Sequence, residues 1–321
     1  MAIAADTSGS LDHLAGVAKA ASDRLRLTIL RLLARESLGV LELCHVLDTP
    51  QPALSHHLKV LLNAGLVATR REGNSVFYRR ALAADDLCHA LYRQVDGLAL
   101  EAALNRGLAD IHAERAEKSR AFFSRHAERF REFQNLIALP DVYLGALAEM
   151  VDRASLERPR HALDVGTGTG ELLPMLAERF ERVTAVDNAP TMLDQARDAT
   201  RRAGLSNIRF VQGEIEDLPQ DSRYDLIVAS MVIHHTPDPA RFCTRAMKCL
   251  REGGLFLIAE LTAHDQDWVR DACGDVWLGF APDELMAWCE QAGLKVDYTQ
   301  YLAQKNGFCI QLLQLSKETN S

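Results

Sequence analysis

The sequence predicts an α/β protein made of a small helical N-terminal part and a larger C-terminal part built on a parallel sheet. From residue 161 onward, short apolar runs alternate with helical patterns, which is typical of a doubly wound sheet. Residues 12–97 instead carry helical periodicity followed by a single hairpin signal. Residues 98–160 lack strand signals and predict connecting helices. The length of 321 residues fits two domains, since a domain averages roughly 150 residues.

Composition is that of a globular protein. Hydrophobic residues make up 48% of the chain and charged residues 25%. No apolar run approaches the roughly 18 residues of a membrane span, and the first ten residues lack the basic flank and apolar core of a signal peptide. The seven cysteines are odd in number and scattered, which favours free thiols in a reducing compartment. We therefore expect a cytoplasmic protein without a disulfide framework or a membrane segment.

Charge is unevenly distributed along the chain. The net charge is −8, yet residues 1–100 hold 11 basic and 10 acidic residues. Residues 50–80 contain five bases and one acid, namely Lys59, Arg70, Arg71, Arg79, Arg80 and Glu72. A basic segment in an acidic chain favours local contact with a polyanion, although a solvated charged face would have the same composition.

The N-terminal part predicts helices followed by a hairpin. Helical spacing covers residues 14–34, with a break at Ser22 and Asp23, and then residues 40–47 and 51–63. Thr49 is placed to cap the last of these helices and Gly65 to end it. Strands are expected at 66–71 and 76–80, with a turn at 72–75. Helix, turn, helix and a basic hairpin together predict a winged helix-turn-helix.

The 51–63 helix would present a polar face suited to the major groove of DNA. Its side chains are of the types that read base edges or bind phosphates: Gln51, Ser55, His56 and Lys59. Four arginines would flank the hairpin and meet the DNA backbone or minor groove: Arg70, Arg71, Arg79 and Arg80. Double-stranded DNA is therefore an expected partner.

The C-terminal part begins with a buried strand, residues 162–165, that runs into a glycine loop. Gly166, Gly168 and Gly170 would let a ligand approach the backbone, and the next helix would point its free N–H groups at that ligand. The spacing G-x-G-x-G is not that of a dinucleotide fingerprint, and the lysine of a P-loop is missing. Taken alone, the loop also fits an ordinary tight turn.

The alternation of patterns predicts seven strands. Five parallel strands are expected at 162–165, 183–187, 208–212, 224–230 and 255–260, and an antiparallel pair at 296–302 and 309–315. Asp187 ends the second strand, 23 residues after Asp164. A carboxylate at that place can accept both hydroxyls of a ribose, so a nucleoside-like ligand is expected.

The connecting residues show two apolar stripes at helical spacing. The first consists of Leu100, Leu104, Leu108 and Ile111, and the second of Phe122, Phe123, Phe130, Phe133, Leu136 and Ile137. Pro140 interrupts the pattern, so one helical stretch is expected before it and another at 141–154. Packing of these helices on a neighbouring element is the simplest interpretation, and the phenylalanines are placed to cover the ligand pocket as well.

Several motifs in the first part closely resemble ArsR-type winged-helix repressors. They lie at 23–30, 42–44, 53–61, 64–67 and 71–73. The resemblance implies a homodimer that binds an operator palindrome, with the first apolar stripe contributing to the dimer interface. Many such repressors respond to metals, but the arsenic-type cysteine pair is absent, since Cys44 is followed by His45-Val46-Leu47. Asp85, Asp86, Cys88 and His89 lack a second histidine pair, so no metal is expected.

The second part closely resembles class I S-adenosylmethionine (SAM)-dependent methyltransferases. The motifs are at 163–170, 186–187, 213–214, 224–227, 234–239 and 250–254. The resemblance implies that Asp164 meets the ligand's ammonium, that Asp187 takes the ribose hydroxyls, and that Ser230 lies below the sulfonium. Met192 would pack on adenine, and Glu214 with the Ile215 N–H would meet its edge. The complete expected site is Asp164, Gly166, Thr167, Gly168, Gly170, Asp187, Asn188, Met192, Gly213, Glu214, Ile215 and Ser230.

The combination of the two parts bears on function. It looks like ArsR-type regulators with a methyltransferase-like domain, some of which sense S-adenosylhomocysteine (SAH) and control methionine and SAM recycling genes. The leading hypothesis is a dimeric repressor whose operator affinity is set by SAH or SAM. The alternative is an active small-molecule methyltransferase with a fused regulator, for which His234 and His235 are weak candidate bases. A metal-responsive repressor with a vestigial second domain is disfavoured.

Overall fold

The computed structural model describes residues 10–34, 36–72, 75–154, 156 and 160–317, apart from the side chains of 72, 120 and 124–131. It divides into two compact units, Met1–Ala113 and Glu114–Ser321. The division lies inside helix α6 (Ala102–Ile137), so this helix belongs to both units. The three-part division at 12–97, 98–160 and 161–321 stays a prediction.

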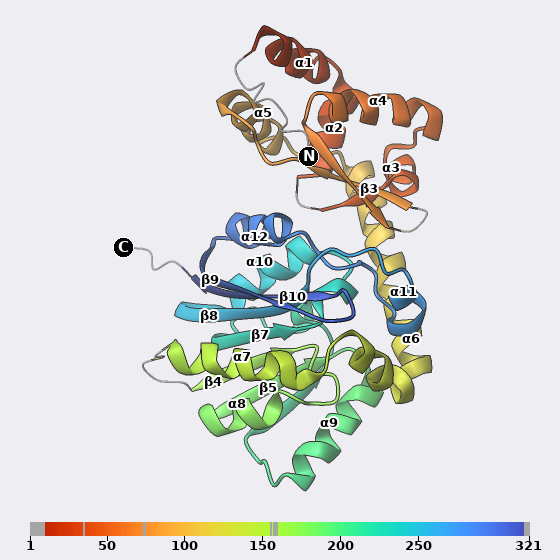
Figure 1. The fold of residues 1–321 in the computed structure, drawn as a ribbon. Coiled ribbons are helices and arrows are strands. Elements are labelled where there is room, and N and C mark those ends of the chain that lie inside the picture. The colour runs from red at the N-terminus through yellow and green to blue at the C-terminus, as the bar shows by residue number, and fades with distance from the viewer. Residues whose placement is uncertain (1–9, 35, 73–74, 155, 157–159, 318–321) are drawn as a thin grey trace. The chain divides into compact units, whose positions relative to one another are not determined.

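The first unit is a helix-turn-helix with a three-stranded wing (Figure 1). Its elements are α1 (Leu11–Ala21), α2 (Arg24–Leu32), β1 (Leu38–Gly39), α3 (Val40–Leu47), α4 (Gln51–Asn63), β2 (Val67–Glu72), β3 (Ser75–Arg80), α5 (Asp86–Asp96) and the beginning of α6. The antiparallel sheet has the order β1-β3-β2, and the short strand β1 was not predicted.

Local chemistry explains the helix boundaries of this unit. The break after α1 occurs where expected, because the Asp23 carboxylate accepts the Arg26 N–H at 3.0 Å and caps α2. The expected cap by Thr49 is wrong: Pro50 precedes α4 without a side-chain cap, and the Thr49 hydroxyl donates to the Leu47 carbonyl. Gly65 follows α4 with φ +69, a conformation that favours glycine. Of the expected hairpin turn, residues 73 and 74 lie outside the described residues.

The first apolar stripe of α6 packs inside its own unit. Ile111 is buried, and Leu100, Leu104 and Leu108 pack against the core formed by the helices of the winged unit. Leu100, Leu104 and Leu108 are only half-buried, and a contribution of this stripe to a dimer interface stays a prediction. Large apolar side chains that do remain exposed on α1, on α5 and just after it are Leu11, Leu14, Leu87 and Leu98.

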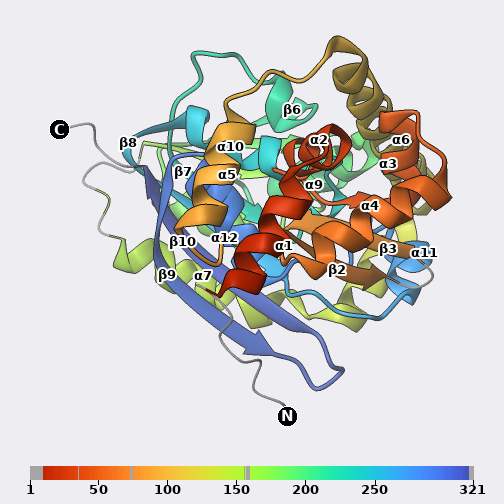
Figure 2. The ribbon, with the colours of Figure 1, turned by 90° about the horizontal axis from the view of Figure 1, so that it is seen from above.

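The second unit is built on a seven-stranded sheet, as predicted, and the order of its strands is β6-β5-β4-β7-β8-β10-β9. Its elements are α7 (Pro140–Arg153), β4 (His161–Val165), α8 (Leu173–Arg179), β5 (Arg182–Asp187), α9 (Pro190–Arg202), β6 (Ile208–Gln212), η1 (Ile215–Asp217), β7 (Tyr224–Ser230), η2 (Ile233–His235), α10 (Pro239–Cys249), β8 (Leu250–Leu261), α11 (Trp268–Cys273), α12 (Pro282–Gln291), β9 (Leu294–Ala303) and β10 (Cys309–Lys317). Strands β4 to β8 pair in parallel, and β10 pairs antiparallel with β8 and β9. Figure 2 shows the β9–β10 hairpin along its length.

Helices cover both faces of this sheet. Helices α7, α8 and α9 lie on one face, and α10 and α12 lie on the other (Figure 1). The second apolar stripe of α6 also packs here, since Phe123 and Ile137 are buried in the core and Phe122 and Phe133 pack against it. Leu136 is exposed, and the side chain of Phe130 lies outside the described residues.

The strand order reverses between β4 and β7, which places the glycine loop at the switch point of the sheet. In doubly wound sheets, ligands bind in the crevice at the carboxyl ends of the strands next to this point. Gly166 has φ +68, and a Cβ atom there would lie 2.2 Å from the Val232 side chain. The loop therefore requires glycine at 166 for both backbone and space. No helix in the described residues is long and apolar enough to cross a membrane.

Candidate functional site

Asp164 lies at the end of β4 with its carboxylate almost completely buried. The Thr167 hydroxyl, from the glycine loop, donates to its Oδ2 at 2.6 Å. Burial raises the pKa of Asp164 to about 7, and the neighbouring Asp187 and Glu171 charges add to this. A cationic group that enters this site would therefore relieve an unfavourable negative charge, which fits the expected role opposite an ammonium.

Asp187 ends the neighbouring strand β5 and holds the glycine loop. Its Oδ2 accepts the Gly168 N–H at 2.9 Å, and its Oδ1 accepts the Ala189 N–H at 2.9 Å. Burial raises the pKa of Asp187 to about 6 despite these two hydrogen bonds. Each oxygen keeps a lone pair, so the carboxylate can still accept a pair of vicinal hydroxyls.

The loop after β6 forms the next wall of the site. Gly213 has φ +146, and the Asp217 carboxylate accepts the Glu214 N–H at 2.9 Å. The Asn188 amide donates to Glu214 Oε1 at 3.3 Å, so the ends of β5 and β6 are linked. Buried Arg245, which was not predicted, reaches over from α10 and donates to the carbonyls of Ile215 and Leu218. Arg245 thus fixes the η1 turn, which contains Ile215 and follows Glu214, onto α10.

Two further side chains of the expected site lie on α9 and at the end of β7. Met192 is fully inside the core with α7 and α8, so its expected contact with adenine stays a prediction. Ser230 lies at the tip of β7, where the hydroxyl of Tyr143 from α7 meets it. Burial and the Glu171 charge raise the pKa of Tyr143, which keeps it a neutral donor. Tyr143 and Glu171 are site residues that sequence reasoning missed, because a tyrosine in an amphipathic helix pattern is indistinguishable from core.

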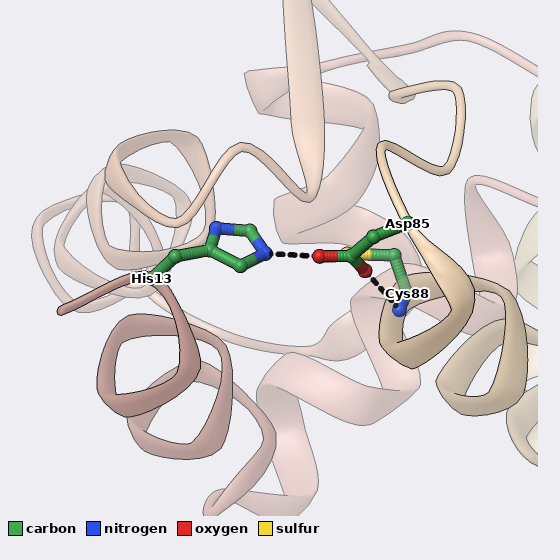
Figure 3. A group of neighbouring side chains, drawn as sticks. All are labelled: His13, Asp85 and Cys88. Atoms are coloured by element: carbon green, nitrogen blue, oxygen red, sulfur yellow. Dashed lines mark hydrogen bonds and ion pairs between the residues drawn. The ribbon is translucent and has the colours of Figure 1, made fainter. Parts of the chain in front are cut away.

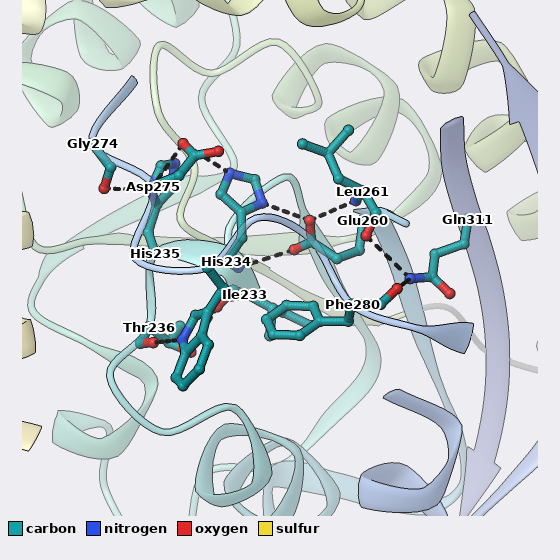
Figure 4. A network of polar contacts seen from close by, with 11 residues as sticks. Ile233, His234, His235, Thr236, Glu260, Leu261, Gly274, Asp275, Phe280 and Gln311 are labelled. Carbon is teal, nitrogen blue, oxygen red and sulfur yellow. Dashed lines mark hydrogen bonds and ion pairs between the residues drawn. The ribbon is translucent and has the colours of Figure 1, made fainter. Parts of the chain in front are cut away.

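His234 and His235 lie in η2, just after β7, within a buried network of polar contacts (Figure 4). His234 Nδ1 donates to Glu260 Oε1 at 2.5 Å, and its Nε2 is 3.8 Å from Asp275 Oδ1. Although burial opposes its charge, the carboxylates of Glu260 and Asp275 raise the pKa of His234 to about 9. Burial and the His234 charge lower the pKa of His235. Since His234 has a carboxylate at each nitrogen, it has little capacity to take a proton from a substrate.

The second half of α6 covers this histidine loop. The Phe123 ring meets the His235 ring edge-on at 4.9 Å between centroids. The Arg115 guanidinium lies 4.4 Å over the Trp277 ring and donates to the Pro237 carbonyl at 3.1 Å. The second half of α6, a helix that the sequence predicted as a connector, therefore packs on the second unit at the loop that contains His235.

In the first unit, helix α4 presents the predicted polar face. Leu54, Leu58 and Leu61 are buried in the core, so the opposite side of the helix faces solvent. All four predicted side chains are exposed there: Gln51, Ser55, His56 and Lys59. Exposed side chains of these types are those that contact bases and phosphates in the major groove, and their contact with DNA stays a prediction.

The four wing arginines do not share one surface. Strand alternation puts Arg70 and Arg79 on one face of the hairpin and Arg71 and Arg80 on the other. Arg71 is exposed, whereas Arg70 and Arg79 are half-buried.

Arg80 has a bidentate partner within the unit, and its contact with DNA stays a prediction. Its guanidinium makes two hydrogen bonds to the Asp96 carboxylate, at 2.7 and 2.9 Å, and lies 4.4 Å over the Tyr92 ring. These contacts hold β3 against α5. They also pair the positive charge of Arg80, which was expected to contact DNA, with Asp96.

Asp85 and Cys88, two of the residues considered above as metal ligands, have hydrogen-bond partners within the protein. His13 from α1 joins Asp85 and Cys88 at the start of α5 (Figure 3). His13 Nε2 lies 2.7 Å from Asp85 Oδ2, and Asp85 Oδ1 caps α5 by accepting the Cys88 N–H at 2.9 Å. Both carboxylate oxygens therefore have protein partners.

Comparison with known families matches each unit separately. Residues 23–69 match the model of the bacterial regulatory protein, arsR family, and residues 163–258 match that of the methyltransferase domain. The chain joins an ArsR-family helix-turn-helix to a methyltransferase domain. The methyltransferase domain supports SAM or SAH as the cofactor, as predicted from the sequence.

Two similar curated relatives are methyltransferases. The 2-methyl-6-phytyl-1,4-hydroquinone methyltransferase 2 of Oryza sativa subsp. japonica is 31% identical over 142 residues, which is 43% of this chain and 40% of that protein. The ubiquinone biosynthesis O-methyltransferase of Coxiella burnetii is 29% identical over 166 residues, 46% of this chain and 70% of that protein. This chain thus spans less than half of the rice protein that it matches.

Solved structures show the same fold. The Burkholderia thailandensis 1,6-didemethyltoxoflavin-N1-methyltransferase, solved with its substrate and SAH, has a TM-score of 0.52 at 21% identity. The similarity covers 69% of this chain and 93% of that one. The individual ligand-contacting and DNA-contacting residues described above stay predictions from geometry and sequence.

Proposed function

We propose that this protein is a homodimeric DNA-binding transcriptional regulator, acting as a repressor, whose operator binding is controlled by SAH or SAM in the methyltransferase domain. We further propose that it acts in the cytoplasm on genes of methionine and SAM recycling. The observation that carries the proposal is the presence, in one chain, of an exposed DNA-reading face on α4 and a nucleoside-type site at β4 and β5.

Two features favour a sensor over an enzyme. The histidines nearest the site are buried, and His234 is held by Glu260 and faces Asp275, so neither is placed as a general base. In addition, α6 contributes Ile111 to the core of the DNA-binding unit and Phe123 to the core of the methyltransferase unit. A helix that is integral to both cores is a suitable element through which ligand binding can alter DNA affinity.

The exposed leucines support dimerisation. Leu11 and Leu14 share one side of α1, and the bond between His13 and Asp85 brings the start of α1 next to the start of α5, where Leu87 is exposed. Exposed large apolar side chains close together are typical of an interface.

A mobility-shift titration on the protein's own promoter, with SAH and SAM in parallel, tests the proposal. We expect one of the two ligands to shift the midpoint by about fivefold or more, the usual range of allosteric coupling. The Asp187→Ala variant should keep DNA binding and lose the shift. An unchanged midpoint with both ligands would contradict the sensor function. Steady production of SAH from SAM with a cell extract, lost in the same variant, would favour the enzyme instead.

A further inference from the structure

Asp275 is a buried carboxylate whose oxygens lack hydrogen-bond donors. It follows α11, and only 4% of its surface is exposed. Within the described residues, neither Oδ1 nor Oδ2 has a hydrogen-bond partner. Burying an unpaired carboxylate costs several kcal/mol or more, so groups of this kind are normally paired, protonated or bound to a cation. The surroundings of Asp275 therefore have to supply a compensating group.

Two imidazoles face this carboxylate at a distance that does not suit hydrogen bonds. His234 Nε2 and His235 Nδ1 each lie 3.8 Å from Asp275 Oδ1. Hydrogen bonds of this type measure about 2.7–3.2 Å. Two ligands bound to one metal ion at about 2.1 Å are separated by about 3.3–3.6 Å at tetrahedral to trigonal angles. The three side chains can place one ligand atom each within 4.8 Å of one another.

Glu260 completes the arrangement behind His234. It accepts a hydrogen bond from His234 Nδ1 at 2.5 Å, and His234 Nε2 faces Asp275, so a metal ion that binds there would replace the Nε2 proton. A histidine that ligates a metal characteristically donates its other ring N–H to a carboxylate or carbonyl, which sets its tautomer and its orientation. The second oxygen of Glu260 accepts the His234 backbone N–H at 3.1 Å, so the ring is held from two sides.

We propose that His234, His235 and Asp275 bind a divalent transition-metal ion, with Zn²⁺ the best match to two imidazoles and one carboxylate. The ion would fix the loop after β7 to the segment after α11, two loops at the ligand end of the sheet. His235 would give up its long hydrogen bond to the Gly274 carbonyl, 3.3 Å, to provide Nδ1. The site is shielded from solvent, because the side chains are buried and Phe123 covers His235.

The His13, Asp85 and Cys88 group serves as the internal comparison. It also consists of potential ligands, but its carboxylate oxygens already accept from His13 and from the Cys88 N–H. It contains a thiol, whereas the proposed site contains none. The two groups therefore differ in a property that spectroscopy detects.

The test uses the untagged full-length chain, stripped with EDTA and titrated with Zn²⁺ and separately with Co²⁺. We expect one Zn²⁺ per chain by elemental analysis and a higher thermal midpoint with Zn²⁺ than with EDTA. Co²⁺ should give visible bands of a nitrogen and oxygen site without a near-ultraviolet thiolate band. Asp275→Asn, close in size and uncharged, should lose the stoichiometric ion, whereas His13→Ala should keep it.

The proposal is overturned if the wild-type chain takes up no stoichiometric Zn²⁺ or Co²⁺ above micromolar affinity. It is also overturned if a thiolate band appears, or if His13→Ala loses the ion and Asp275→Asn keeps it. If Asp275→Asn does not fold, the Co²⁺ spectrum and the Zn²⁺ dependence of the wild-type thermal midpoint decide by themselves. The outcome is independent of the proposed regulatory function, since no readout involves DNA, SAM or SAH.

Discussion

Asp164 makes the stability of the unliganded protein depend on pH. Its folded pKa of about 7 lies above the reference value of 3.8. The stability that it contributes is therefore fully present below about pH 4 and is lost as pH rises through about 7. Raising the pH from about 5 to about 8 should lower the thermal midpoint more in the wild type than in Asp164→Asn, whose side chain does not ionise. Equal pH profiles for the two proteins would show that this carboxyl ionises normally.

The same ionisation controls ligand binding. An ammonium group binds the charged form of Asp164, and Asp187, with a pKa of about 6, accepts hydroxyls best when ionised. The thermal shift that SAH produces should therefore increase from about pH 5.5 to about pH 8. A shift that is constant over this interval, measured in one buffer series at fixed ionic strength, would contradict the assignment of both carboxylates.

The requirement for glycine at position 166 can be tested by substituting Gly166 and its neighbour Val232. In Gly166→Ala the new Cβ would collide with Val232, and the positive φ adds roughly 1–2 kcal/mol of backbone strain. We expect a lower thermal midpoint and loss of SAH binding. The double variant with Val232→Ala should recover part of the stability, because it removes the nearest atom, Cγ2 at 2.2 Å, and leaves the Val232 Cβ contact at 2.7 Å and the backbone strain. If Val232→Ala restores nothing, the backbone strain and the Cβ contact account for the glycine without a contribution from Cγ2.

At the scale of elements, the recognition helix and the wing make different predictions. Lys59 is exposed on α4, whereas Arg80 is paired with Asp96 and stacked on Tyr92. Lys59→Ala should weaken DNA binding for every sequence and reduce the salt slope of binding by about one for each bound protomer. Arg80→Ala should leave the slope unchanged and lower the thermal midpoint, because it frees β3 from α5. A reduced slope in Arg80→Ala would return this arginine to the interface.

The elements were predictable from sequence to the extent that local periodicity determines them. The strands and α4 follow from apolar spacing, and Asp164 and Asp187 are found because parallel strands end at one edge of the sheet. Contacts between residues distant in sequence were not predictable. Arg80 meets Asp96, Tyr143 meets Ser230, and His234 meets Asp275 only through the packing of separate elements. An arginine in a basic hairpin is the same in sequence whether it binds DNA or a neighbouring helix.

For the whole molecule, the proposed function requires that the two units communicate, and α6 is the element that belongs to both. Its first half is anchored by Ile111 and its second half by Arg115 and Phe123. Each half is bonded within its own unit, so the helix between these anchors is a continuous route by which a change in the second unit can reach the first. Ala113 lies there with its side chain exposed.

Ala113→Pro is therefore the test of communication. A proline in a helix interior removes one hydrogen bond, clashes with the preceding turn and costs about 3 kcal/mol, while an exposed side chain leaves both cores intact. We expect the variant to bind its promoter and to bind SAH with near-normal affinities, and to lose the effect of SAH on DNA binding in a mobility-shift titration. Ala113→Ser, which keeps the helix, should retain the effect. A full ligand response in Ala113→Pro would show that the units communicate by another route, for example through the dimer, and would remove α6 as the coupling element.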